Sequence, residues 1–239
     1  MEWKDEKPVS PHFRGFEELA ICWELAAQVN LPFYNSHYGI RSLTMGRHRE
    51  FDVQEVLDAV LDVFWKKGYE GASYADLTSA AGIERPALYS AFGNKESLFK
   101  KALERYYDHH LAFFPLALLL PTAREVIECL LLKSIELNTR YPDKTGCLGI
   151  QGALACSDSS ESVRLAIVDA RANGEKKLKE RLELAKDDGD LPESADCAVL
   201  ASYVCAVLHG MAVQAKAGFT KDRLEAVAAQ ALIGWPSNK

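Results

Sequence analysis

Three side chains near residue 90 have the types and the spacing needed to bind DNA. Arg85 stands at the start of an expected short helix, where its guanidinium can form a bidentate pair with O6 and N7 of a guanine. Tyr89, one turn later, carries a hydroxyl that can reach a phosphate. Lys95 follows Asn94, an expected helix N-cap, so a phosphate there can meet both an ammonium group and a helix N-terminus.

The cysteines and histidines offer a second kind of chemistry, which is metal or redox sensing. The six cysteines are Cys22, Cys129, Cys147, Cys156, Cys197 and Cys205. No two of them have the C-x-x-C spacing, but Cys205 and His209 stand one helical turn apart and can share a metal ion. A cysteine in an alanine-rich helix is more often a small buried hydrophobic residue. We therefore expect no cofactor, and a metal site at Cys205 and His209 is the alternative.

Two expected helices come before the one that carries Arg85. Apolar residues between positions 53 and 64 fall at i, i+3, i+4, i+7, i+8 and i+11, which is the stripe of an amphipathic helix. The second helix opens at Ser73, with Asp76 as its partner in a capping box, and it stops at Gly82.

The third helix begins at Glu84 or Arg85, with Pro86 in its first turn. Leu88 and Phe92 are one turn apart and are expected to face the core. The outward positions at its N-terminal end are Glu84, Arg85, Ala87 and Ser90. Together the helices predict a helix-turn-helix unit whose last helix enters the major groove by that end.

Residues 46 to 99 resemble the DNA-binding domain of the TetR/AcrR family of one-component bacterial regulators. The matching stretches are Gly46-Arg47, Phe64, Gly68-Tyr69-Glu70, Ser73, Ala80-Ala81-Gly82-Ile83, Ala87-Leu88-Tyr89, Phe92 and Asn94-Lys95-Glu96-Ser97-Leu98-Phe99. The resemblance implies that Ser73, Tyr89 and Lys95 hold the DNA backbone, while the exposed face of the third helix sets the sequence. Pro86 and Ala91 stand where many members have Gly and His, so the base-contacting set departs from the family pattern.

The charge balance favours specific over generic DNA binding. The chain has a net charge of −6, and residues 46 to 101 hold eight Lys and Arg against nine Asp and Glu. The acids crowd the first helix, whereas Arg47, Arg49, Arg85 and Lys95 fall where DNA should lie. We therefore expect little non-specific affinity.

Neither a membrane nor an oxidising compartment is expected. Residues 197 to 213 carry no charge and approach the length of a membrane span, but they include a histidine, a glycine and several alanines, so a buried helix is the better interpretation. The absence of C-x-x-C pairs and of a signal peptide predicts free thiols in the cytoplasm.

Residues 1 to 44 stand outside the helix-turn-helix pattern. Family members usually begin just before the Gly-Arg pair, and here Met45 precedes it directly. We expect residues 1–44 to be an N-terminal extension that is not native, with a genuine arm that packs on the body or touches DNA as the alternative. The helix-turn-helix domain then covers residues 45–99.

Residues 100–239 are expected to form an all-α effector-binding and dimerisation domain. The helices expected at 194–217 and 220–234 are apolar on more than one face, so each needs a second partner, which is most simply another copy of the chain. The resemblance agrees, since the last two helices of this family usually make the dimer interface. Segments near 146–148 and 210–218 look like a branch that includes a copper-responsive repressor, but they transfer no ligand.

The leading hypothesis is a homodimeric repressor that a small-molecule effector, not identified by the sequence, releases from a palindromic DNA operator. The alternatives are a DNA-binding dimer without ligand sensing and a repressor that responds to metal or to cysteine chemistry. The sequence has no Ser-His-Asp order, phosphate loop or nucleotide fingerprint, so we do not expect an enzyme.

Overall fold

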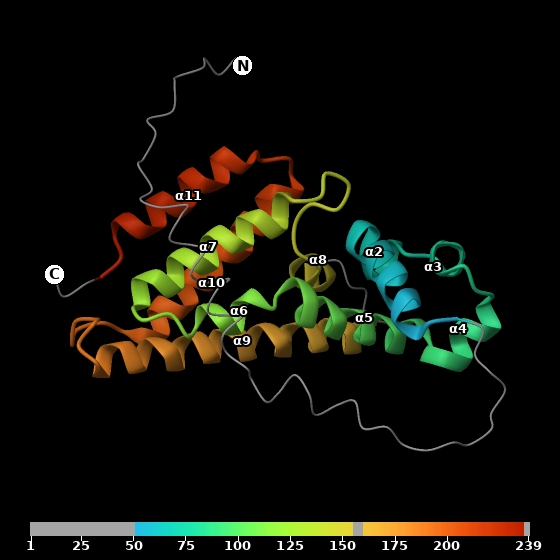
Figure 1. Cartoon of the computed structure of the whole chain (residues 1–239), viewed down its shortest axis with the longest axis horizontal. Helices are drawn as coiled ribbons and strands as arrows, with labels where there is room; N and C mark the ends of the chain where they lie inside the picture. Colours follow the sequence, from blue (N-terminus) through green and yellow to red (C-terminus); the bar gives the residue numbers. More distant parts are fainter. Residues whose placement is uncertain (1–50, 155–159, 237–239) are drawn as a thin grey trace, which may run out of the picture. The chain divides into compact units, whose positions relative to one another are not determined.

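The computed structural model describes residues 51–154 and 160–236, and every regular element in these ranges is an α-helix (Figure 1). This confirms the predicted all-α fold. The expected extension at residues 1–44 lies outside the described residues, as do Arg47 and Arg49.

The described chain is a succession of helices joined by short turns. The first four are α2 (Val53–Gly71), α3 (Tyr74–Ala81), α4 (Arg85–Phe92) and α5 (Lys95–His110). The others are α6 (Phe113–Ala117), α7 (Ala123–Thr139), α8 (Leu148–Leu154), α9 (Glu161–Asp187), α10 (Cys197–Lys216) and α11 (Lys221–Ile233). Helices α2 to α4 are the helix-turn-helix unit, and α6 to α11 form the C-terminal body.

Both of the first two helices have side-chain caps, and the predicted capping box of the second is confirmed. The Asp52 carboxylate accepts the Gln54 N–H at 2.6 Å at the start of α2. The Ser73 hydroxyl accepts the Asp76 N–H at 3.1 Å while the Asp76 carboxylate accepts the Ser73 N–H at 3.0 Å, which completes the capping box of α3. Gly82 ends α3 with φ 64°, a left-handed conformation that glycine adopts without steric cost.

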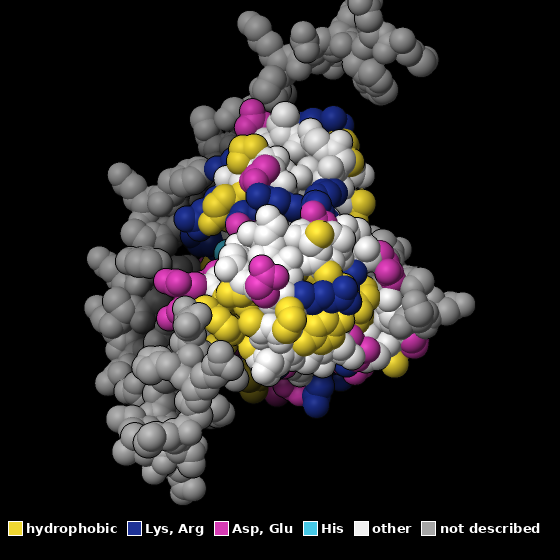
Figure 2. All heavy atoms as spheres, turned by 90° about the vertical axis from the view of Figure 1, so that its right-hand side faces the viewer, with side chains coloured by type: hydrophobic (Ala, Val, Ile, Leu, Met, Phe, Trp, Pro, Cys, Tyr) yellow, Lys and Arg dark blue, Asp and Glu magenta, His cyan; other side chains and the backbone are white. Residues whose placement is uncertain are grey.

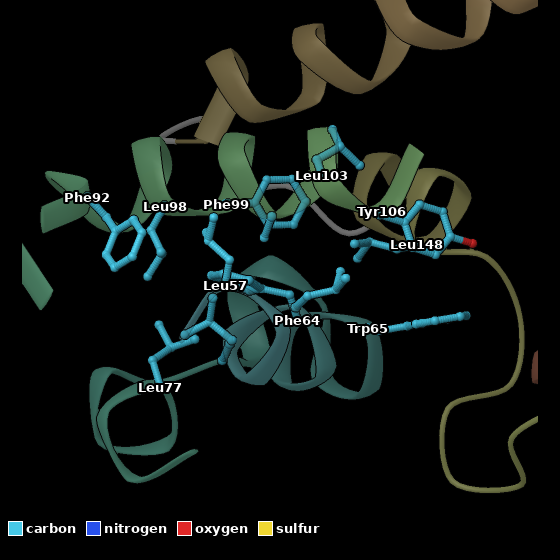
Figure 3. Packing of buried hydrophobic residues seen from close by; sticks show 14 of the residues in the cluster. Leu57, Phe64, Trp65, Leu77, Phe92, Leu98, Phe99, Leu103, Tyr106 and Leu148 are labelled. Carbon is cyan, nitrogen blue, oxygen red and sulfur yellow. The ribbon is translucent and has the colours of Figure 1, made fainter. Parts of the chain in front are cut away.

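The core of the helix-turn-helix unit is built on aromatic side chains of α2 and α5. Phe64 and Trp65 of α2 are fully buried. The Phe64 ring meets Phe99 edge-on with centroids 5.0 Å apart, and the Trp65 ring meets Tyr106 in the same way at 4.9 Å (Figure 3). Such pairs add to the free energy gained by burying the rings. The position of α2 is therefore tied to that of α5.

The same hydrophobic cluster continues past residue 99 into the C-terminal body. Leu148 of α8 and Val163 and Ile167 of α9 belong to it, and all three are fully buried. No gap in packing accompanies the predicted domain boundary between residues 99 and 100. Helix α5 thus packs against both parts, and α8 and α9 share a core with the helix-turn-helix unit.

The acidic side chains of α2 are used inside the protein. Asp58 pairs with Arg105 of α5, and this hydrogen bond lowers the pKa of Asp58. Asp62 pairs with Lys144 of the turn between α7 and α8. These pairs take much of the negative charge of α2 away from the DNA-binding side.

Helix α10 packs on α7, α9 and α11, but an apolar face of α10 stays uncovered in a single protomer. Val199, Tyr203 and Val213 on this face are 62%, 44% and 42% exposed. Val227 and Ile233 of α11 are also exposed. Within the described ranges α10 alone has the length and hydropathy of a membrane span, a test that core helices of soluble proteins also pass, and 33% of the tested stretch is buried.

Candidate DNA-binding surface and sensor cluster

Helix α4 presents its N-terminal end outward, as predicted, and buries Leu88 and Phe92 on the other side. The predicted outward residues Glu84, Arg85 and Ser90 are exposed, Tyr89 is 37% exposed and Ala87 is half-buried. Ala87 is less exposed because it borders the buried face at Leu88. The turn at Gly82 and the Pro86 ring in the first turn set where this end begins.

The described residues on the side of the molecule that carries α3 and α4 form no continuous basic field. Figure 2, viewed from that side, shows Lys and Arg side chains in separate groups next to hydrophobic and acidic ones. A surface of this kind gains little from the general attraction between basic proteins and DNA. Weak non-specific binding therefore stays a prediction.

Arg85 lies in an aromatic stack that sequence reasoning missed. Its guanidinium carbon is 4.1 Å from the centroid of the Tyr74 ring, and its Nη2 donates to the Tyr89 hydroxyl at 3.2 Å. The Tyr74 and Tyr89 rings are themselves stacked, with centroids 5.2 Å apart. Tyr74 directly follows the Ser73 cap, and an aromatic residue at that place was the available signal. The stack and the hydrogen bond therefore hold the Arg85 guanidinium itself in place at the exposed end of α4.

Lys95 lies at the start of α5 and contacts the same region. Its ammonium group is 4.6 Å from the centroid of the Tyr69 ring, and its backbone N–H donates to the Tyr74 hydroxyl at 3.1 Å. Partial burial lowers the pKa of Lys95. Asn94 caps α5 by accepting the Ser97 N–H, as predicted. An ammonium group and a capped helix N-terminus therefore lie together beside α4.

The Ser73 hydroxyl is occupied in the protein alone. It donates to the Asp76 carboxylate at 2.8 Å, and the hydrogen bond from Lys67, followed by those from Ser73, lowers the pKa of Asp76 to about 2. The phosphate contact predicted for Ser73 would thus need its hydroxyl to turn away from Asp76, or would be made by N–H groups of the first turn of α3.

The turn between α7 and α8 connects the C-terminal body to α2. Trp65 donates its indole N–H to the Gly146 carbonyl at 2.9 Å, and Lys66 pairs with Asp143 at 2.6 Å. Gly146 has φ 81°, and a β-carbon there would lie 3.0 Å from the carbonyl of Ala212 in α10. Only glycine fits this close passage between α2 and α10. Gly146 therefore contacts Trp65 of α2 and lies close to the backbone of α10.

A polar cluster lies where α9 and α10 pack together. Arg171 of α9 donates from Nη2 to Nδ1 of His209 at 2.9 Å, so His209 is a neutral acceptor. Burial, and next the charge of Arg171, lower the pKa of His209 to about 4, and burial raises the pKa of Cys205 to about 11. Sequence reasoning missed Arg171, although it is an arginine in the buried stripe of α9 that includes Ile167 and Leu178.

The contacts in this cluster determine whether Cys205 and His209 are placed to share a metal ion. The Arg171 guanidinium takes up Nδ1 of His209 and opposes the approach of a second positive charge. Among the described side chains, no group of three or more His, Cys, Asp or Glu is placed to share a metal ion. The geometry instead gives Cys205 and His209 a neutral state beside a cation.

The low pKa of His209 predicts a loss of stability on mild acidification. The unfolded chain binds a proton at this residue near pH 6.5 and the folded chain only near pH 4, so the free energy of unfolding falls as the pH drops through this window. After discounting for partial exposure, we expect a loss of about 1–3 kcal/mol. The comparison is urea unfolding of wild type and of His209→Gln, which still accepts from Arg171.

His110 has a pKa lowered by burial and contributes with the same sign in both proteins, so their difference isolates His209. Parallel stability curves for wild type and His209→Gln between pH 7 and 4.5 would show that His209 is not responsible.

An exposed recognition helix on an all-helical body defines a class of protein, the helix-turn-helix transcriptional regulators. Residues 56–102 match the family described as bacterial regulatory proteins, tetR family, and residues 127–231 match the tetracyclin repressor-like C-terminal domain. The chain belongs to the tetR family of bacterial regulatory proteins, which are regulators and not enzymes.

Characterised relatives agree along most of the chain. The HTH-type transcriptional repressor ComR of Escherichia coli (strain K12) is 30% identical, over 80% of this chain and 92% of that protein. The HTH-type transcriptional repressor BdcR of the same strain is 29% identical, over 80% of this chain and 92% of the length of BdcR. A cysteine mutant of the regulator CifR, solved in complex with 26bp double-strand operator DNA, has 40% identity and a TM-score of 0.76, covering 80% of this chain and 100% of that one.

Proposed function

We propose that the protein is a cytoplasmic homodimeric repressor that binds a two-fold symmetric operator and leaves it when a small-molecule effector binds the C-terminal body. The observation that carries this proposal is the pairing of an exposed α4 with an uncovered apolar face on α10 and α11. Two copies of α4 about 34 Å apart would enter successive major grooves on one side of the DNA.

The uncovered face favours a second copy of the chain over a membrane. Its large apolar residues, Val199, Tyr203 and Val213, follow one line along α10, and Val227 and Ile233 of α11 extend the surface. Within the two helices expected to form the interface, Val199 and Val227 are exposed, Leu208 is half-buried, and Leu232 is 5% exposed and belongs to the protomer's own core. A regulator with this face exposed gains most by covering it with the same face of another copy.

The effector part of the proposal rests on the coupling between the body and α2. An effector that binds the body more tightly in one arrangement of α8 to α10 would shift the population toward that arrangement. The turn at Gly146 and the shared core around α5 would carry the shift to α2 and change the separation of the two α4 helices.

The test is a gel shift with the DNA that flanks the protein's own gene, against shuffled DNA of equal length and composition. We expect a complex with two protomers per site that persists at moderate salt on the flanking DNA alone. Equal retention of the shuffled DNA at every salt concentration would contradict a sequence-specific regulator.

Arg85→Ala should relax the base preference at one position in each half-site and should cost about 1–3 kcal/mol of binding free energy. The physical reason is loss of the bidentate pair with a guanine. Selection of preferred sequences from a random pool measures the effect. Arg85→Lys is the control, because it keeps the charge and lacks the planar fork. An unchanged preferred sequence in both variants would show that Arg85 is not the base-reading residue.

Lys95→Ala should weaken binding to all sequences alike and should reduce the slope of log affinity against log salt by about one phosphate contact per half-site. Tyr89→Phe should also weaken all sequences but leave the slope unchanged, since it removes no charge. Lys101→Ala, an exposed lysine further along α5, is the matched control. A sequence-dependent loss in Lys95→Ala would argue against a backbone contact.

A further inference from the structure

Arg171 is a half-buried cation of the C-terminal body whose hydrogen bonds are incomplete. Its Nη2 bonds to the neutral His209, and its Nε–H is buried and has no partner among the described residues. The described part of the chain shows no ion pair for it. A half-buried guanidinium that has no anion is costly, and an unpaired buried donor adds to the cost.

The polar groups around Arg171 are held neutral. Burial raises the pKa of Tyr107 well above its ordinary value, and burial also raises the pKa values of Cys147 and Cys205. The positive charge of Arg171 lowers the pKa values of these three side chains and so opposes the effect of burial. It also lowers the pKa of His209. None of these groups supplies the missing negative charge.

Glu175, one turn along α9, is the carboxylate of this cluster. It acts electrostatically on Cys205 and His209, and it accepts a hydrogen bond from the Ser202 hydroxyl of α10. Glu175 is thus committed to α10. A ligand beside Arg171 must carry only one negative charge, because a dianion such as phosphate would leave excess negative charge next to Glu175.

An aromatic ring lies next to Gly174, one turn along α9 from Arg171. Gly174 is three residues after Arg171, in the middle of a 27-residue helix, where glycine is the least favoured residue after proline. A β-carbon at Gly174 would find its nearest neighbour, Cζ of Phe114 in α6, at 3.9 Å. A β-carbon would fit here in ordinary van der Waals contact, so packing within the protomer does not require glycine, and the glycine leaves the edge of the Phe114 ring without a side chain from this position.

We infer that the effector is a monocarboxylic acid with an alkyl or aryl group, whose carboxylate pairs with Arg171 and whose apolar part lies over Gly174 against Phe114. The inference rests on the proposed function, since it names the ligand of the proposed sensor. A carboxylate accepts two parallel N–H bonds from a guanidinium, and Arg171 offers its Nε–H and a remaining Nη–H.

The location fits a regulatory ligand. Arg171 acts on the Cys147 thiol, which accepts from the Tyr106 hydroxyl at 3.3 Å, and the preceding residue, Gly146, accepts from Trp65 of α2. A carboxylate that draws Arg171 away from His209 would alter the contact between α9 and α10 beside this chain of contacts.

The experiment titrates the full chain with hexanoate, benzoate and phenylacetate and with the matching amides, and follows heat of binding and thermal unfolding. We expect at least one acid to bind and raise Tm, and its amide to bind at least about tenfold more weakly, because hydrogen bonds to charged groups are the strong ones. Equal binding of acid and amide, or no binding by any acid, would overturn the inference.

Two variants locate the site. Arg171→Met should lose about tenfold or more in affinity for the acid, whereas Lys177→Met, which removes one exposed positive charge from the same helix, should not. Gly174→Leu places a larger side chain against Phe114, leaves Arg171 itself unchanged and should also abolish binding. It keeps the test decisive if Arg171→Met fails to fold. An acid that binds Gly174→Leu as it binds wild type does not occupy this site.

Failure of this inference and failure of the proposed function have different signatures. A protein that retains its operator but binds no acid remains a sequence-specific regulator with a different ligand. A protein that binds the acid but no flanking DNA contradicts the proposed function. Release of the operator by the acid in wild type, and its loss in Arg171→Met, would support both.

Discussion

Val199→Asp is expected to yield a helical monomer that binds the operator at least about a hundredfold more weakly than the wild type, because two linked half-site contacts become one. Val199 is 62% exposed in the protomer, so the aspartate costs little in folding. In a two-fold interface the same residue appears on both copies, and two carboxylates would be brought into an apolar surface. Sedimentation, circular dichroism and a gel shift measure the three parts of this prediction.

Leu119→Asp is the matched control for this prediction. Leu119 follows α6 and is 63% exposed, so the change in charge and exposed area is nearly the same at a position outside α10 and α11. It should leave the dimer and the operator affinity intact. Leu232→Asp should instead unfold the protein, because Leu232 is a core residue of the protomer. A wild-type chain that sediments as a monomer at micromolar concentration would refute the dimer.

The sequence was informative wherever the determinant is local. The capping box at Ser73 and Asp76, the turn at Gly82 and the cap at Asn94 each involve residues within three or four positions of one another. Short-range hydrogen bonds of this kind leave a pattern in the sequence that can be read without knowing the fold.

The contacts that sequence reasoning missed join distant residues. Trp65 and Gly146 are 81 positions apart, and Arg171 and His209 are 38 apart. Nothing local marks Gly146 as the partner of an indole. Arg171 differs, since a charged residue in the apolar stripe of α9 was visible, but its partner depends on how α9 and α10 pack. The stack of Arg85 on Tyr74 likewise depends on the angle between α3 and α4, which periodicity does not give.

Trp65→Ala is expected to cost about 3–5 kcal/mol of unfolding free energy, the range for removing a large buried aromatic side chain. Trp65 is fully buried, and its ring contacts those of Tyr106, His110 and Tyr141 with centroids 4.9, 4.8 and 5.9 Å away. Its loss would also leave the Gly146 carbonyl without its indole donor. Urea unfolding followed by circular dichroism measures the cost.

Trp65→Phe separates packing from coupling. Phenylalanine keeps most of the ring contacts but cannot donate to Gly146, so the fold and the affinity for the operator should persist while the effector releases DNA less completely. Lys66→Met is the control, because it breaks the neighbouring ion pair between Lys66 and Asp143. The side chains of this pair are 41% and 64% exposed, so the pair should contribute little to stability. Normal effector response in Trp65→Phe, with full loss in Lys66→Met, would show that the ion pair and not the indole couples the body to α2.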